Sequence, residues 1–159
     1  MILLEQENVV PDHPDKEDGG PLGLAAICGR AGVVEILLER QDVDPNRPNK
    51  NGRMPLGFSA IEENEGGVKV LLEGESVDPD RPDEDGYGPL GYAAICGKEG
   101  VVEILLERQD VDPNRPNKED RTSLGCAVIK GHEGVVKILL EREDADPDRP
   151  DKNGYGLLG

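Results

Sequence analysis

Histidine and cysteine are the residue types that most often carry nucleophilic or acid–base chemistry, and this chain has few of either. Its two histidines, His13 and His132, lie far apart in the sequence. No cysteine has a histidine or a basic residue next to it that would lower the thiol pKa. Because no nucleophile, base and acid can be assembled from these residues, the sequence predicts that the chain is not an enzyme.

One acidic segment has the spacing of a calcium-binding loop in its first half. Asp144, Asp146 and Asp148 match the first three oxygen ligands of an EF-hand. Arg149 then takes the place of the obligatory glycine, and Tyr155 takes the place of the bidentate glutamate. A solvated acidic loop is therefore the better interpretation, and we expect neither a metal ion nor another cofactor.

The charge balance narrows the class of partner. The chain has 34 acidic and 18 basic residues, which gives a formal net charge of −16. Nucleic acids and anionic membranes are bound through lysine and arginine, so we expect neither as a partner. No apolar run approaches the roughly 20 residues that a membrane-spanning helix needs. The acidity favours basic partners, or it merely keeps the chain in solution.

An internal repeat determines the elements that would position any site. The segment GVVEILLERQDVDPNRPNK occurs at Gly32–Lys50 and again, unchanged, at Gly100–Lys118. Looser copies lie at Gly66–Glu84 and Gly134–Lys152, so the period is 34 residues. A period of this length indicates a solenoid, a propeller or another array of stacked units.

Each unit reads as two short helices and a loop. Pro21 suits the first turn of a helix, and Gly29 suits the left-handed residue that ends one. A second helix is expected from about Gly32, because apolar residues follow it at helical spacing. Prolines beginning with Pro45 prevent this helix from continuing, and Asn51-Gly52 marks a tight turn before the next unit.

The pattern that recurs in every unit reads, in its first full copy, Pro21-Leu22-x-x-Ala25-Ala26, Gly29, Gly32-Val33-Val34-x-Ile36-Leu37-Leu38 and Val43. It resembles the ankyrin repeat, whose usual period is 33 residues. The family's Thr-Pro-Leu-His motif is degraded, since its threonine survives only as Thr122 and glycine replaces its histidine in every copy. The DPNRPNK segment is similar to ankyrin arrays that are common in fungal proteins with many repeats.

This resemblance implies an all-α solenoid of helix–turn–helix units with short β-turn arms. Residues 1–159 would form a single array. We expect full repeats at about 20–53, 54–87, 88–121 and 122–155, a partial repeat at 1–19 and the start of another at 156–159. The incomplete units predict that the chain is a fragment of a larger protein. The odd number of cysteines, none in a CxxC pair, fits a reducing compartment, which is the cytosol or the nucleus.

The resemblance also implies where a partner would bind. Ankyrin arrays generally meet their partners with the tips of the turns and the exposed side of the inner helices. The tip residues would be Arg53, Tyr87, Arg121 and Tyr155, and tyrosine and arginine are enriched at binding hot spots. The inner helices would contribute one row made of Ile27, Ile61, Ile95 and Ile129, and a second made of Cys28, Glu62, Cys96 and Lys130. Alternatively, the isoleucines simply pack between the inner helices.

The function implied by the resemblance is non-catalytic recognition of a protein or peptide. The acidic charge predicts a partner segment with apolar residues flanked by lysine or arginine. The alternative is a structural or designed scaffold with no dedicated partner, which the near-identity of the repeats favours. We expect a chain that is mostly monomeric with weak end-to-end association, because Leu3, Leu4, Leu157 and Leu158 belong to stacks whose partners are missing.

Overall fold

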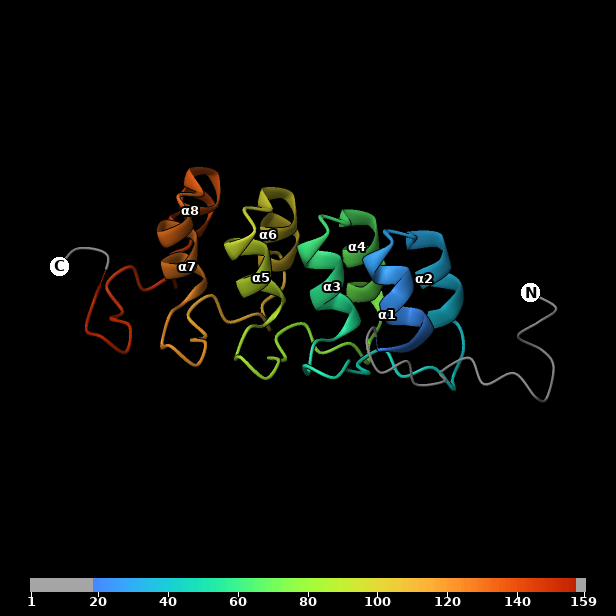
Figure 1. The fold of residues 1–159 in the computed structure, drawn as a ribbon. Coiled ribbons are helices and arrows are strands. Elements are labelled where there is room, and N and C mark those ends of the chain that lie inside the picture. The colour runs from blue at the N-terminus through green and yellow to red at the C-terminus, as the bar shows by residue number, and fades with distance from the viewer. Residues whose placement is uncertain (1–18, 157–159) are drawn as a thin grey trace.

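The computed structural model describes residues 19–156, which form eight α-helices arranged as four consecutive pairs (Figure 1). We call the first helix of each pair inner and the second outer. The inner helices are α1 (Gly20–Ile27), α3 (Pro55–Ile61), α5 (Pro89–Ile95) and α7 (Ser123–Lys130). The outer helices are α2 (Ala31–Leu38), α4 (Glu65–Glu73), α6 (Glu99–Leu106) and α8 (Glu133–Leu140). The all-helical solenoid expected from the sequence is thus confirmed within the described residues.

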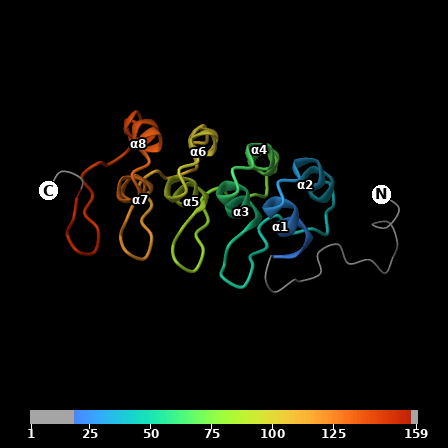
Figure 2. The ribbon, with the colours of Figure 1, turned by 45° about the horizontal axis from the view of Figure 1, so that its top comes forward.

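The four pairs stack side by side into an extended array. Each inner helix packs against the next inner helix, each outer helix packs against the next outer helix, and the two helices of a pair pack against each other. Figure 2 shows the two rows of helices, with the loops projecting from the inner row away from the outer row. We call these loops the arms; they comprise residues 39–54, 74–88, 107–122 and 141–156.

The core is a ribbon of aliphatic side chains that runs the length of the array. Small residues separate the inner helices, and Ala26, Ala60 and Ala94 are all 0% exposed. One leucine at the start of each inner helix is also buried, and full burial of such a side chain contributes about 1.5–3 kcal/mol. These leucines are Leu22, Leu56, Leu90 and Leu124. Neither helix of a pair is long enough to be stable alone, so this burial between repeats maintains the fold.

The inner helices end as the sequence predicts, with one exception. Gly29, Gly97 and Gly131 follow their helices in the left-handed region, with φ of 66°, 70° and 73°. In the second repeat Glu63 occupies this position with φ of 57°. A residue with a Cβ is strained there, whereas glycine is not.

Each arm turns around one polar side chain. The side-chain oxygen Oδ1 of Asn49 accepts hydrogen bonds from the backbone N–H of Asn51 and of Arg53, at 2.9 and 3.0 Å. The same two bonds recur at Asp83, Asn117 and Asp151. Neighbouring arms are joined by single backbone hydrogen bonds, such as that from Glu84 N–H to the Asn51 carbonyl at 3.1 Å. The arms therefore hold the start of each inner helix at a fixed distance from the next.

Candidate functional site

The predicted isoleucine row lies at the C-terminal ends of the inner helices. Ile27, Ile61 and Ile95 are each the last residue of their helix and are half-buried. Ile129 in α7 is 60% exposed. The row is therefore neither fully buried between helices nor fully free, and each repeat presents one branched apolar side chain in part to solvent.

The second predicted row follows the isoleucines directly. Cys28, Glu62 and Lys130 are exposed, and Cys96 is half-buried. The described structure thus contains an apolar row flanked by a row of mixed character. Glu62 belongs to this second row, and Glu63 follows it directly in the sequence.

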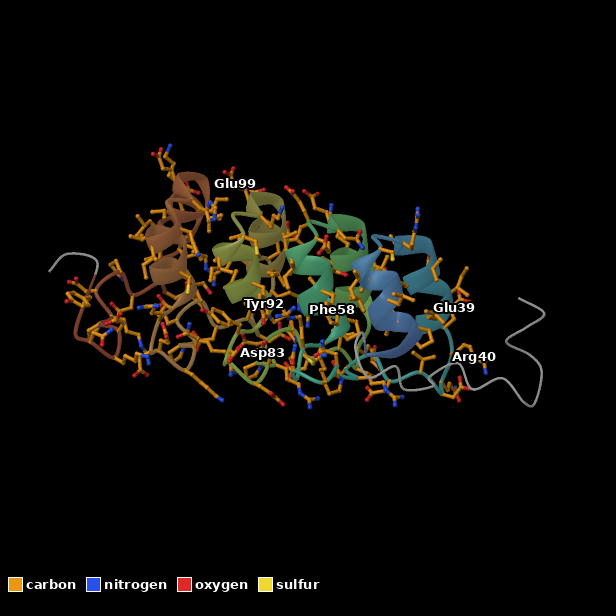
Figure 3. The ribbon with its side chains drawn as sticks, viewed as in Figure 1. Glu39, Arg40, Phe58, Asp83, Tyr92 and Glu99 are labelled. Atoms are coloured by element: carbon orange, nitrogen blue, oxygen red, sulfur yellow. The ribbon has the colours of Figure 1, made fainter. Side chains whose placement is uncertain are left out.

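The tip residues are arranged differently from the expectation, because three of the four contact residues of later repeats. The Arg53 guanidinium carbon lies 4.3 Å from the centre of the Tyr92 ring and 5.6 Å from the centre of the Phe58 ring. Arg53 Nη2 also donates a hydrogen bond to the Tyr92 hydroxyl at 2.6 Å. That hydroxyl in turn donates to Asp83 Oδ2. Figure 3 shows Tyr92 and Phe58 at the arm-side ends of their helices, with Asp83 on the arm below.

Tyr87 repeats this arrangement one unit further along. Its ring lies against Tyr92, with the ring centres 5.3 Å apart. Its side chain lies beside Asn117 and Cys126, which occupy the positions that Asp83 and Tyr92 hold for Arg53. Burial raises the pKa of the Tyr87 hydroxyl.

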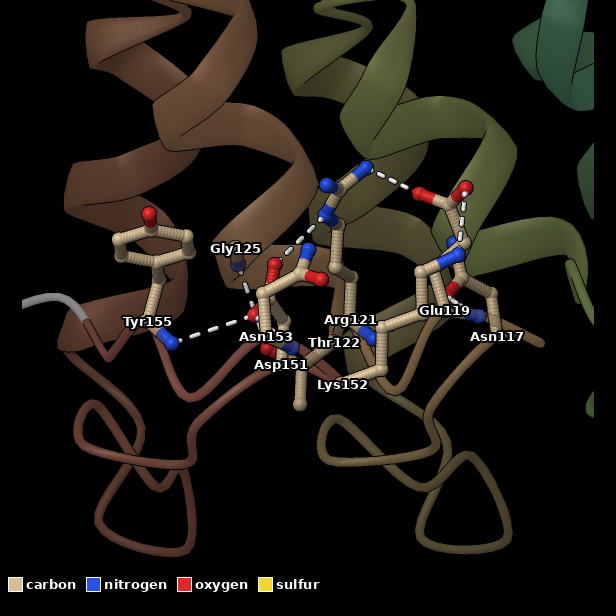
Figure 4. A network of polar contacts seen from close by, with 9 residues as sticks. All are labelled: Asn117, Glu119, Arg121, Thr122, Gly125, Asp151, Lys152, Asn153 and Tyr155. Carbon is tan, nitrogen blue, oxygen red and sulfur yellow. Dashed lines mark hydrogen bonds and ion pairs between the residues drawn. The ribbon is translucent and has the colours of Figure 1, made fainter.

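Arg121 makes the same connection between the third and fourth repeats (Figure 4). Its Nε donates to Asp151 Oδ2 at 3.2 Å, and its Nη1 donates to Glu119. Lys152 Nζ approaches the other oxygen of Glu119 at 3.3 Å and adds a further ion pair between the two arms. Only Tyr155, which is 71% exposed, has its side chain largely in solvent.

The glycine that replaces the family's histidine has a structural reason. A Cβ built on Gly57 would lie 3.1 Å from Arg53 Cγ, and one built on Gly91 would lie 3.2 Å from Tyr87 Cδ1. In these two repeats the tip side chain lies against the first turn of the inner helix and would have to shift to admit a larger residue, whereas a Cβ at Gly125 would meet nothing closer than 3.7 Å. The tip, the glycine and the isoleucine four residues later share one face of each inner helix.

Sequence reasoning missed the residues that receive the tip side chains. They form two columns, one of Phe58, Tyr92 and Cys126 and one of Asp83, Asn117 and Asp151. Tyr92 is 8% exposed, and burial together with its bond to Asp83 raises its pKa to about 12. Burial likewise raises the pKa of the Cys126 thiol, which makes this cysteine a poor nucleophile at neutral pH.

One hollow brings three of the candidate residues together. Arg121, Ile129 and Tyr155 line a hollow of about 170 Å³ between α7 and the last arm, with Val128 at its apolar side. Val128 is 40% exposed, whereas Ala94, at the same position of the previous repeat, is covered by α7. The hollow therefore lies on the face of α7 that, in the other inner helices, packs against the next inner helix. We interpret it as part of this stacking surface and not as a ligand pocket.

The remaining chemically active residues have structural surroundings. His132 Nε2 lies 3.1 Å from the Ile95 carbonyl oxygen and so connects the third and fourth repeats. Within residues 19–156, no three histidine, cysteine or acidic side chains are placed to hold a metal ion. No helix in the same part of the chain is long and apolar enough to cross a membrane. His13 lies outside the described residues.

Comparison with known proteins agrees with this architecture. The family model for ankyrin repeats, in three copies, matches residues 66–151, which are 86 of the chain's 159 residues. No curated protein matches the chain. The matched part extends from Gly66 in α4 to Asp151 in the last arm and contains both helices of the third and fourth pairs.

Proposed function

Since the chain belongs to the ankyrin repeat family, we propose that it is a non-catalytic module that binds a protein or peptide along its inner helices. Ankyrin repeats are generally protein–protein interaction modules, and the family supplies this coarse role. The observation that supports the inner helices as the binding surface is the isoleucine row, which is solvent-accessible in all four repeats.

The spacing of the row favours an elongated partner segment. Adjacent inner helices pack directly, so the row offers an apolar side chain at each helix-to-helix step of roughly 8–10 Å. A segment that presents apolar residues at a similar spacing would place one against each repeat. The net charge of −16 favours lysine or arginine beside those apolar residues.

The tip residues contribute to this proposal indirectly. Arg53, Tyr87 and Arg121 are occupied by contacts between repeats, so their part is to hold the inner helices in register. Tyr155 is the tip residue that offers a free aromatic side chain, and it would contact a partner that extends past the fourth repeat.

We further propose an intracellular location, in the cytosol or the nucleus. All three cysteines are free, and Cys28 is exposed. Exposed free thiols are compatible with a reducing compartment and are disfavoured in an oxidising one. We also propose that the module works as part of a larger protein, as ankyrin arrays often do.

A scaffold with no dedicated partner is the competing proposal. It is supported by the unchanged repetition of Gly32–Lys50 at Gly100–Lys118, because a binding surface usually varies from repeat to repeat. The internal use of the three tip side chains points the same way.

A capture experiment with matched variants separates the two. The chain would be used as bait in a cell lysate beside the double variant Ile61→Asp with Ile95→Asp. The control carries Ile36→Asp with Leu140→Asp. These two apolar residues are 50% and 51% exposed and lie on the outer helices, away from the isoleucine row. Binding through the isoleucine row predicts capture by the wild type and the control and loss with the double variant. Equal capture by all three chains, or by none, would contradict the proposal.

A further inference from the structure

An arginine and an aspartate two residues apart mark the start of three of the four arms. Arg108 donates from Nε and Nη2 to the two carboxylate oxygens of Asp110, at 2.9 and 2.7 Å. The same fork joins Arg40 to Asp42 and Arg142 to Asp144. The carboxylate fixes the orientation of each guanidinium group.

In two of these arms the guanidinium group also donates a hydrogen bond to the preceding repeat. Arg108 Nη1 donates to the carbonyl oxygen of Leu72 at 3.0 Å, and Arg142 Nη1 donates to that of Leu106 at 2.7 Å. Both carbonyls lie at the C-terminal end of an outer helix, where backbone oxygens lack helical partners and the helix dipole is negative. A cation is therefore favoured at this place on both electrostatic and hydrogen-bonding grounds.

The second repeat lacks both members of the pair. Gly74 stands at the arginine position and Ser76 at the aspartate position. Consequently no arginine from the second arm reaches Leu38, the residue of α2 that corresponds to Leu72 and Leu106. A hollow of about 390 Å³ lies at this place, between the end of α2 and the start of the second arm.

The walls of the hollow match the two parts of an arginine side chain. Its apolar lining comes from Leu38, Val43 and Val77, which suits the methylene stem. Its acidic lining comes from Glu39 and Glu75, whereas the charge of Arg40 is compensated by Asp42. Glu39 and Arg40 lie at the arm-side end of α2 (Figure 3).

We propose that this hollow, which we call the Gly74 hollow, binds the arginine side chain of a partner protein. The partner's guanidinium would take the position that Arg108 and Arg142 fill in the neighbouring repeats, donating to the Leu38 carbonyl. The stem would lie on the apolar wall. This site is formed by the outer helices and the arms, so it is separate from the isoleucine row and does not depend on the function proposed for that row.

The test uses N-acetyl-arginine amide as the probe, titrated into the ¹⁵N-labelled chain and followed by amide chemical shifts. The control ligand is N-acetyl-citrulline amide, which has nearly the same shape but no charge. The proposal predicts saturable shifts at Leu38–Val43 and Gly74–Val77, several-fold weaker binding of citrulline, and no shifts at the corresponding place filled by Arg108. Equal binding of both ligands, or shifts spread over all four repeats, would overturn it.

Two variants move the affinity in opposite directions. Ser76→Asp restores the carboxylate that holds the guanidinium elsewhere, so it should tighten binding of the arginine probe several-fold. Gly74→Arg together with Ser76→Asp supplies an internal arginine and should abolish the shifts. A Cβ at position 74 would lie 3.1 Å from Val77 Cγ2 and 3.2 Å from the Leu71 carbonyl oxygen, so the double variant requires a local adjustment. If the double variant does not fold, Ser76→Asp alone decides the test. Unchanged affinity in Ser76→Asp would contradict the proposal.

Discussion

The guanidinium carbon of Arg53 lies 4.3 Å from the centre of the Tyr92 ring, and Arg53 Nη2 donates a hydrogen bond to the Tyr92 hydroxyl at 2.6 Å. The two residues belong to different repeats and are 39 positions apart in the sequence. The first arm, which contains Arg53, thereby contacts α5, the inner helix of the third pair. Interactions of this kind, rather than the helices alone, keep the inner row in register.

Replacing Tyr92 by phenylalanine tests this relationship. At neutral pH the variant should lose about 1–2 kcal/mol of unfolding free energy, because Arg53 and Asp83 lose a buried hydrogen-bonding partner. Urea unfolding measures the difference. Tyr155→Phe is the control and should be neutral, since Tyr155 is 71% exposed.

The same variant predicts a pH dependence with a definite sign. The pKa of Tyr92 is raised to about 12 in the folded chain, from an ordinary value of 10.0. The folded state therefore keeps this proton longer than the unfolded state, and the stabilisation is full below about pH 10 and is lost as the pH rises toward about 12. The gap in stability between wild type and Tyr92→Phe should narrow over this range. A gap that widens would contradict the assignment.

Replacing Glu63 by glycine should stabilise the chain. Glu63 has φ of 57°, while its counterparts in the other repeats are Gly29, Gly97 and Gly131. Relief of the left-handed strain should add about 1 kcal/mol, and the exposed ion pair to Lys98 that is lost contributes less than that. Thermal unfolding provides the measurement. Glu62→Gly, at a residue with ordinary φ of −82°, is the control and should destabilise.

Asp80 should be improved by asparagine. In the first and third arms, Asn46 and Asn114 at this position both donate to and accept from the next arm. Asp80 is 8% exposed and can only accept when ionised, and burial raises its pKa despite the bond from Arg115 Nε at 2.8 Å. Asp80→Asn should therefore raise the unfolding free energy at neutral pH by about 1 kcal/mol.

The pH dependence of this variant provides its control. A carboxyl group whose folded pKa is raised stabilises most below its unfolded pKa, and that contribution is lost as the pH rises through the folded value. The advantage of Asp80→Asn should thus shrink as the pH falls through the raised folded pKa of Asp80. Asn114→Asp, the reverse substitution at the same position of the third arm, should lower the unfolding free energy at neutral pH. A destabilised Asp80→Asn variant would mean that the bond to Arg115 outweighs the burial of the charge.

The two end faces of the described array predict weak association between copies. Leu24 on α1 is 47% exposed, although its counterparts Phe58, Tyr92 and Cys126 are buried. At the other end of the described array, Val128 on α7 is 40% exposed. Contact between unlike faces extends an array without closing it, so sedimentation should show weak, concentration-dependent growth that Leu24→Glu reduces. A tight dimer at micromolar concentration would contradict this prediction.

The fold was accessible from the sequence because it depends on local signals repeated in register. Prolines, glycines and aliphatic spacing define each helix pair, and a 34-residue period requires the pairs to stack. Gly67 shows the limit of column-by-column reasoning. It replaces a core valine, yet a Cβ there would lie 2.2 Å from Asn64 Nδ2, because Asn64 folds over Gly67 to cap α4.

The site was less accessible, because it depends on where side chains point after the repeats stack. The isoleucine row could be located because it recurs every 34 residues and the resemblance to ankyrin repeats places it on the inner helices. The inward direction of Arg53 and Tyr87 could not, since it depends on partners in the next repeat and on irregular arms. The glycines at 57 and 91 were the available signal for that packing, and the joint loss of arginine and aspartate at Gly74 and Ser76 was the available signal for the hollow.

The central claim, that a partner binds along the isoleucine row, is tested most directly by methyl NMR of the chain labelled at its isoleucine δ1 carbons. A partner recovered in the capture experiment would be added to saturation. The account predicts shifts at the inner-helix methyls and none at the outer-helix methyls of the same molecule. The inner set is Ile27, Ile61, Ile95 and Ile129, and the outer set is Ile36, Ile104 and Ile138. Shifts confined to the outer set would contradict it.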